Sequence, residues 1–266
     1  MKIGISSLFI AEKPFEELLA KITSYGAECR CWEIVDEYRR KIDQRQIALL
    51  KDLKESYGLE YTVHAPFSDL NIASMSSEVR RLSLKILKRS LSNAAALGAR
   101  VWIFHPGNHG PMSCFLPGED VKLNLDSTAE LADYAADVGV QLGIENMPNG
   151  FAALLARVEE FEGFFQAAKP NIGLALDVGH AHTVGQLELF LKKFGDRLVH
   201  VHVHDNNRSS DAHLDIGAGS INWVETLSYL KRDGFNGILM VESIYDPLRS
   251  FRTLREFVER GVPVRE

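Results

Sequence analysis

The segment LVHVHVHD, residues 198–205, decides how this chain is interpreted. His200, His202 and His204 alternate with valines, so a β-strand would place all three imidazoles on one face and the valines on the other. Buried polar groups are almost always hydrogen-bonded, so three inward-facing histidines need a metal ion or a polar network. We expect His202 to be a metal ligand, His200 to lie deeper in the core, and His204 to contact a bound small molecule.

Five other short apolar runs also end in a histidine or a carboxylate. They are YTVHAP, VWIFHPG, LGIENM, LALDVGH and ILMVES, and a polar segment, DAHLDIG, adds two further groups. Histidine nitrogen and carboxylate oxygen suit zinc, manganese and related divalent ions. The sequence therefore predicts nine metal ligands: His64, His105, Glu145, Asp177, His180, His202, Asp211, His213 and Glu242. Asp211 and His213 are the least secure of these, because a polar loop is solvated by default.

Strand-like and helix-like segments alternate along the whole chain. Apolar runs suited to strands cover residues 2–8, 27–35, 59–66, 99–106, 140–146, 172–178, 198–204 and 237–243. Amphipathic stretches cover residues 14–25, 44–57, 78–97, 120–138, 151–168, 186–195, 222–233 and 248–260. This pattern predicts an α/β fold, a single (β/α)8 TIM barrel over residues 1–266, with the metal site at the C-terminal face of the strands. A doubly wound open sheet is the alternative, but only a closed sheet brings so many strand ends to one point.

Composition restricts the setting in which the protein works. The N-terminus meets an acidic residue too early for a signal peptide, and no apolar run approaches the ~20 residues of a membrane span. Cys29, Cys31 and Cys114 form no paired framework, so we expect reduced thiols and a cytoplasmic protein without membrane partners. A net charge of -6 argues against broad nucleic-acid binding. The sequence does not indicate an oligomeric state.

The motifs HAPFSDLNIAS, HPG, IEN, DVGHA, HVHDN, HLDIGAGSINW and VES, in this order, resemble the xylose-isomerase-like TIM barrel superfamily. This superfamily includes endonuclease IV (AP endonuclease family 2) and the sugar phosphate isomerases and epimerases. The resemblance covers essentially the whole chain and implies up to three divalent ions, Zn2+ foremost, with Mn2+ or Co2+ as alternatives. It implies one ion on His64, His105 and Glu145. A second would take Glu145, Asp177, His202 and Glu242, and a third His180, Asp211 and His213.

Two activities follow from this resemblance. The favoured one is isomerisation or epimerisation of a small sugar or sugar phosphate through an enediolate, with Glu145 and Glu242 as the acid/base pair. The alternative is a zinc-dependent endonuclease IV-like hydrolase, with nucleic acid as partner. The complete ligand set favours the alternative, because three ions would attract a phosphate. Two features depart from an AP endonuclease and support the favoured activity. The segment after His64 reads FSDLN where the resemblance to an AP endonuclease implies a tyrosine-led, DNA-penetrating loop. The sequence also lacks the basic, aromatic surface that base flipping needs. The basic run 39–41 could line phosphates, but we favour a solvated helix face.

Overall fold

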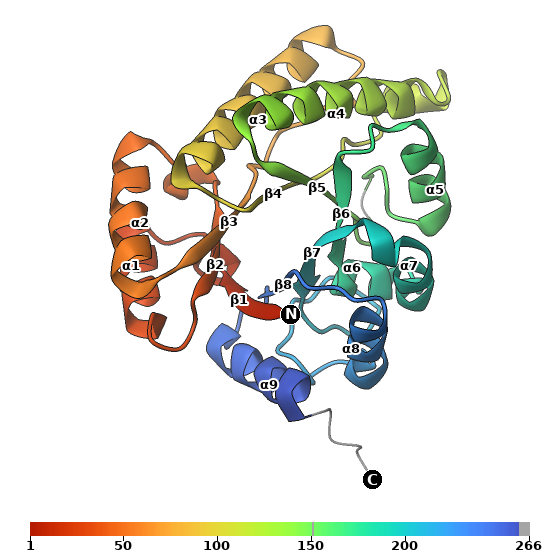
Figure 1. Ribbon diagram of the computed structural model, residues 1–266. Coiled ribbons are helices and arrows are strands. Elements are labelled where there is room, and N and C mark those ends of the chain that lie inside the picture. The colour runs from red at the N-terminus through yellow and green to blue at the C-terminus, as the bar shows by residue number, and fades with distance from the viewer. Residues whose placement is uncertain (151, 261–266) are drawn as a thin grey trace.

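The computed structural model describes residues 1–150 and 152–260, which form a closed ring of parallel strands surrounded by helices (Figure 1). The strands are β1 (Lys2–Ser6), β2 (Cys31–Val35), β3 (Glu60–His64), β4 (Val101–Phe104), β5 (Gln141–Glu145), β6 (Ile172–Asp177), β7 (Leu198–Val203) and β8 (Ile238–Val241). They pair in chain order, and β8 pairs with β1 in the register Gly4 to Met240. The predicted (β/α)8 barrel is therefore confirmed, and the open sheet is excluded because the ring closes.

The helices cover the outside of the ring, and most begin and end where the sequence indicates. They are α1 (Phe15–Tyr25), α2 (Gln44–Tyr57), α3 (Ser77–Leu97), α4 (Glu119–Val138), α5 (Val158–Ala167), α6 (Val178–Thr183), α7 (Leu187–Phe194), α8 (Trp223–Arg232) and α9 (Pro247–Arg260). Asp43 caps α2 with a capping box, and Gly58 ends that helix at φ 65°. The helix expected over residues 151–168 starts only at Val158. Residue 151 and residues 261–266 of the predicted domain lie outside the described residues.

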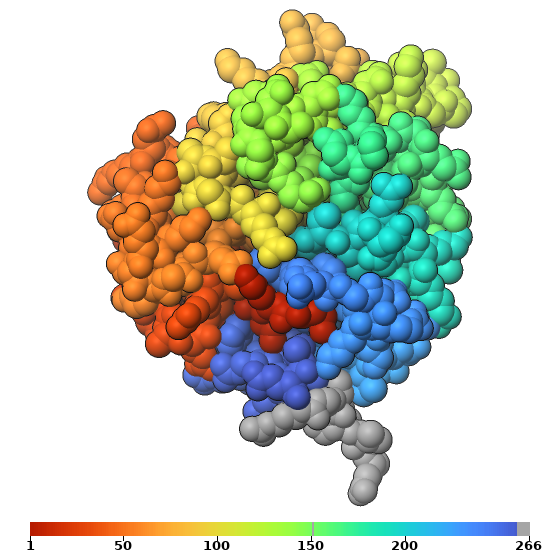
Figure 2. Space-filling model, viewed as in Figure 1, coloured from red at the N-terminus to blue at the C-terminus, as the bar shows by residue number. Residues whose placement is uncertain are grey.

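Three clusters of buried apolar side chains stabilise the described part of the barrel. The largest one lies between the sheet and the helices and includes Trp32, Trp102 and Phe161, all fully buried. Side chains also fill the ring that looks open in the ribbon, as the space-filling view shows (Figure 2). The expectation that the valines of β7 share one face of the strand is wrong for Val199. A shift of register between β6 and β7 turns Val199 toward Gly173, away from the largest cluster.

The exit from β2 also differs from the expectation. The expected solvated helix face over the basic run 39–41 is wrong for Arg40, which is fully buried in the short 3-10 helix η2 (Tyr38–Arg40). Arg39 and Lys41 are exposed, as expected. Among the described helices, none combines the length and the apolar character needed to cross a lipid bilayer.

Candidate metal centre

All the candidate ligands come from the C-terminal ends of strands or from the loops and the short helix α6 that follow them. His64, Glu145 and Asp177 are the last residues of β3, β5 and β6. His105 and Glu242 directly follow β4 and β8. His202 lies on β7, His180 on α6, and Asp211 and His213 on the loop between β7 and α8. Parallel strands in a closed barrel point in one direction, so these ends meet at one face.

The first group consists of His64, His105 and Glu145. Both histidines point their Nε2 atoms at the same carboxylate oxygen, Oε2 of Glu145, each at 3.2 Å. The two imidazole rings meet edge to face, with centroids 4.9 Å apart. Glu145 and His64 are buried, whereas His105 is partly open to solvent. Two nitrogens and a shared carboxylate oxygen at this spacing could hold a divalent ion.

The second group lies beside the first and shares Glu145 with it. Its members are Glu145, Asp177, His202 and Glu242, and all four are buried. His202 turns Nδ1 toward Glu145 Oε1 at 2.9 Å, while its Nε2 lies 3.8 Å from Glu242 Oε1. Asp177 Oδ2 is buried without a hydrogen-bond partner among the described residues. Three carboxylates around one imidazole give a hard, mostly oxygen donor set that fits manganese, cobalt or zinc.

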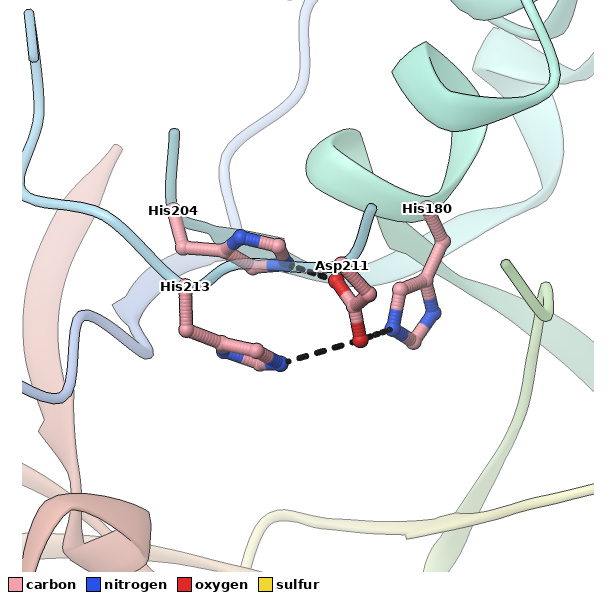
Figure 3. Close-up of side chains that lie close together, drawn as sticks. All are labelled: His180, His204, Asp211 and His213. Atoms are coloured by element: carbon pink, nitrogen blue, oxygen red, sulfur yellow. Dashed lines mark hydrogen bonds and ion pairs between the residues drawn. The ribbon is translucent and has the colours of Figure 1, made fainter. Parts of the chain in front are cut away.

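The third group gathers around Asp211 (Figure 3). Oδ2 of Asp211 lies 3.1 Å from His180 Nε2 and 3.2 Å from His213 Nε2. His204 approaches the other oxygen, Oδ1, at 3.4 Å. The ligand atoms of these four residues all lie within 4.8 Å of one another. The structure thus brings together all nine sequence-predicted ligands, in three adjacent groups, and adds His204 to the third.

Backbone carbonyls fix the orientation of three of these imidazoles. His64 Nδ1 donates to the carbonyl of Ala65 at 2.8 Å, and His213 Nδ1 donates to the carbonyl of Glu242 at 2.9 Å. His180 Nδ1 donates in the same way to Asn146, at 2.7 Å. A ring that donates through Nδ1 presents the lone pair of Nε2, and in all three cases Nε2 faces a carboxylate of the centre. This is the arrangement by which proteins prepare histidines for a metal ion.

The electrostatics of the centre show that its buried carboxylates require positive charge. Burial alone would lower the pKa of His64, but the hydrogen bond to Glu145 and its charge outweigh burial and raise that pKa to about 9. The pKa of His180 is raised to about 10, because Asp177 and Asp211 outweigh its burial. Burial raises the pKa of Glu242, and the charge of His202 only partly offsets it. Divalent cations provide the same compensating charge as imidazolium groups, so this donor set fits a metal.

Three residues with important contacts are missing from the sequence-based site. Glu33, in the middle of β2, is fully buried and accepts from His202 Nε2 at 3.2 Å. Asn146 exchanges two hydrogen bonds with the backbone of Asp177, through its amide oxygen at 2.7 Å and its amide nitrogen at 3.0 Å. Asp205 accepts from the backbone of Gly217 and from Trp223 Nε1, at 2.9 and 3.0 Å. The signal for Glu33 was a lone carboxylate within the apolar run CWEIV.

A cavity of about 410 Å³ opens onto residues of all three groups, because His180, Asp211 and His213 line it together with His64, His105, Glu145 and Glu242. Polar lining comes from the centre itself, including His64, Glu145 and Glu242. Apolar lining includes Leu8, Val35, Phe67, Met147 and Pro148. The volume lies within the usual range of small-molecule sites. His204, expected at the substrate, is fully buried and does not belong to the residues that line this cavity.

A family comparison agrees with this fold and these motifs. The profile of the xylose isomerase-like TIM barrel family matches residues 19–260, and this chain belongs to that family.

The relatives of this chain include an uncharacterized protein, an epimerase-like protein and a probable endonuclease. An uncharacterized protein of Methanocaldococcus jannaschii is 35% identical over 97% of this chain and 90% of its own length. A solved structure described as a D-tagatose 3-epimerase-like protein is 34% identical, with a TM-score of 0.92 and coverage of 98% of both chains. A probable endonuclease 4 of Staphylococcus aureus is 28% identical over 75% of this chain and 72% of its own.

Proposed function

We propose that this protein is a metal-dependent isomerase or epimerase that acts on a small sugar or sugar phosphate. One observation carries the proposal: the carboxylates of Glu145 and Glu242 both line one cavity of about 410 Å³ and belong to the same four-residue donor group. Two carboxyl groups at one small, enclosed site are suited to removing a proton and returning it. The likeness to a D-tagatose 3-epimerase-like protein supports the same reaction class.

Glu145, Asp177, His202 and Glu242 would hold the ion that this reaction uses. When bound there, a divalent cation supplies Lewis-acid stabilisation of the negative charge that develops on the substrate oxygens. Zinc is the first choice, and manganese or cobalt would suit the same donors. The donors are already gathered by the strand ends, so little reorganisation accompanies binding.

The acid/base pair approaches the cavity from two separated strands. Glu145 ends β5 and Glu242 follows β8, which lie on different sides of the ring (Figure 1). One carboxylate takes the proton from the carbon next to the substrate carbonyl, and the bond electrons move onto the carbonyl oxygen to give an enediolate. The other carboxyl group returns a proton to that carbon from the opposite face, which inverts its configuration.

The apolar lining contributes by excluding water from the proton transfer. Phe67 packs over His105 with ring centroids 5.3 Å apart, and it meets the ring of His64 edge to face at 5.5 Å. Leu8 and Met147 line other parts of the cavity. A lower local dielectric strengthens every interaction of the charged groups with the reacting atoms.

Solvent exchange tests the proposed proton transfer. Purified protein loaded with Zn2+, Mn2+ or Co2+ is incubated with D-tagatose, D-fructose and D-allulose, and with their phosphates, in deuterated water. Deuterium at the carbon next to the carbonyl, together with the epimer, is the expected result. Glu145→Gln and Glu242→Gln should both abolish this exchange, while Glu130→Gln, on the exposed face of α4, should retain it. Exchange that persists in either cavity variant would refute the assigned acid/base pair.

The third donor group supports a second candidate, a zinc phosphodiesterase of the endonuclease IV type. The observation behind this candidate is the convergence of His180, Asp211 and His213 beside the other two donor groups. The family resemblance implies that an epimerase needs only the ion on Glu145, Asp177, His202 and Glu242. An assay on duplex DNA with one abasic site, with and without chelator, separates the two candidates. Chelator-sensitive strand cleavage without any sugar exchange would replace the epimerase proposal.

A further inference from the structure

His204 is a buried imidazole to which neither reaction above assigns a partner. It directly follows β7, and its side chain is fully buried. Neither ring nitrogen forms a hydrogen bond with any residue in the described part of the chain. Nε2 nevertheless lies 3.2 Å from Asp177 Oδ1 and 3.4 Å from Asp211 Oδ1. Buried side-chain nitrogens almost always form a hydrogen bond or bind an ion. We therefore expect a nitrogen of this ring to bind a ligand or a metal ion.

Packing holds the His204 ring in this position. A β-carbon added at Gly179 would lie 2.0 Å from Cε1 and 2.3 Å from Nε2 of His204, so the imidazole rests directly on the backbone of α6. On the other side it stacks on His213, with ring centroids 3.8 Å apart and planes at 17°. The ring therefore cannot turn away from Asp211 without displacing one of these neighbours.

The other donors around Asp211 approach only one of its two carboxylate oxygens, and His204 faces the second one. His180 and His213 both donate through Nδ1 to backbone carbonyls, and both present Nε2 to Asp211. His204 faces the other oxygen of Asp211 (Figure 3). Asp211 Oδ1 is itself buried without a hydrogen-bond partner among the described residues.

We propose that His204 is the fourth protein ligand of an ion held by His180, Asp211 and His213. Three imidazole nitrogens and one carboxylate oxygen within 4.8 Å of one another match the four-coordinate preference of zinc. A site filled by four protein donors is closed, whereas catalytic zinc sites keep a position for water or substrate. This ion ties α6 to the loop between β7 and α8. His180, Asp211 and His213 line the cavity, and the buried His204 closes the coordination sphere on the side away from it. A complete third group is then compatible with a sugar epimerase.

Zinc binding alone tests the assignment, independently of any activity. Metal-free protein is reloaded with ZnCl2, separated from free zinc, and measured by elemental mass spectrometry. His204→Asn and Asp211→Asn should each bind one zinc fewer per chain than the unchanged protein, and the double variant should also lose one. His109→Asn, a histidine outside the three groups, is the matched control and should keep the full number. With Co2+ in place of zinc, His204→Asn should also shift the visible absorption bands.

Three results would overturn the assignment. The first is an unchanged zinc count and cobalt spectrum in His204→Asn. The second is a double variant that loses two ions, because His204 would then serve the Asp177 ion. The third result comes from a second variant, Gly179→Ala, which is used if His204→Asn does not fold. Gly179→Ala keeps all four donors but displaces the imidazole of His204. An unchanged zinc count and cobalt spectrum in that variant would also contradict a ligand role for His204.

Discussion

Glu33 and Glu145 lie against opposite nitrogens of the same imidazole. Nδ1 of His202 faces Glu145 Oε1 at 2.9 Å, and Nε2 faces Glu33 Oε2 at 3.2 Å. Glu33 also receives a hydrogen bond from Thr62 and lies 3.1 Å from His200 Nε2. A carboxylate behind a metal-binding histidine fixes the tautomer and increases the basicity of the nitrogen that faces the ion. We therefore expect Glu33 to be a positioning residue for His202.

Replacing Glu33 by Gln should weaken metal binding without removing a ligand. Loss of such a supporting carboxylate typically lowers metal affinity by about 10–100-fold. The measurement is the zinc dissociation constant, obtained by competition with a chelator of known affinity. Thr62→Val, which removes only one hydrogen bond to Glu33, should have a smaller effect. Equal affinity in Glu33→Gln and the unchanged protein would show that Glu33 only fills space.

The sequence predicts those parts of the centre that repeat from strand to strand. His64, Glu145 and Asp177 each end an apolar run, and strand ends in a parallel barrel meet by construction. Glu33 escaped prediction because a single carboxylate within a strand has no periodicity, and only the closed ring brings β2 opposite β7. The burial of His204 was also hidden: alternation gives its face, but not the contact with Gly179, on the helix after β6. The turn of Val199 depends on a register shift that no local pattern encodes.

Asp205 should determine whether the loop that carries Asp211 and His213 keeps its shape. Its backbone pairs with Leu214, at 2.9 and 2.8 Å, and its carboxylate accepts hydrogen bonds from Gly217 and Trp223. Asp205→Asn keeps the size but loses acceptor capacity, which should cost about 1–3 kcal/mol. We expect faster proteolysis within residues 206–221 and weaker zinc binding by the third group alone. Equal weakening at all the zinc sites would contradict this local role.

Asp120 should make stability depend on pH through the loop after β4. This buried carboxylate on α4 accepts from Ser113 and lies 2.7 Å from His109 Nδ1. Burial would raise the pKa of Asp120, but the Ser113 hydrogen bond and His109 outweigh it, so the pKa is lowered. A carboxyl group with a lowered native pKa stabilises the fold above its unfolded value, about 3.9, and loses this effect as pH falls through the native value.

Asp120→Asn should therefore be less stable than the unchanged protein at pH 7, by about 1–3 kcal/mol. The difference should shrink as the pH is lowered below about 4. Urea denaturation at a series of pH values measures both quantities. Asp126→Asn, at an exposed position of the same helix, is the control and should change little. A difference that stays constant down to pH 3 would mean that packing, and not charge, explains the loss.

Gly107 and Gly110, in the loop that follows His105, should respond in opposite ways to alanine. A β-carbon at Gly107 would lie 2.3 Å from Ala73 Cβ and 2.5 Å from the Ala73 nitrogen, two atoms that can move only with the backbone, and 2.7 Å from Asn71 Oδ1. Forcing extra volume into a packed contact typically costs about 1–3 kcal/mol. Gly110 has open space around the same position and a φ of -101°, which alanine adopts freely.

Gly110→Ala should then be neutral or stabilising by up to about 1 kcal/mol, because it restricts the unfolded chain. Thermal unfolding of the two variants measures the contrast directly. Gly107 also binds the loop to α4, since its N–H donates to Asn124 at 2.9 Å. Gly107→Ala should therefore loosen the first donor group and lower the zinc affinity at His105 as well as the melting temperature. Similar melting temperatures for the two variants would show that the Ala73 segment moves aside, and the first donor group would then not depend on this contact.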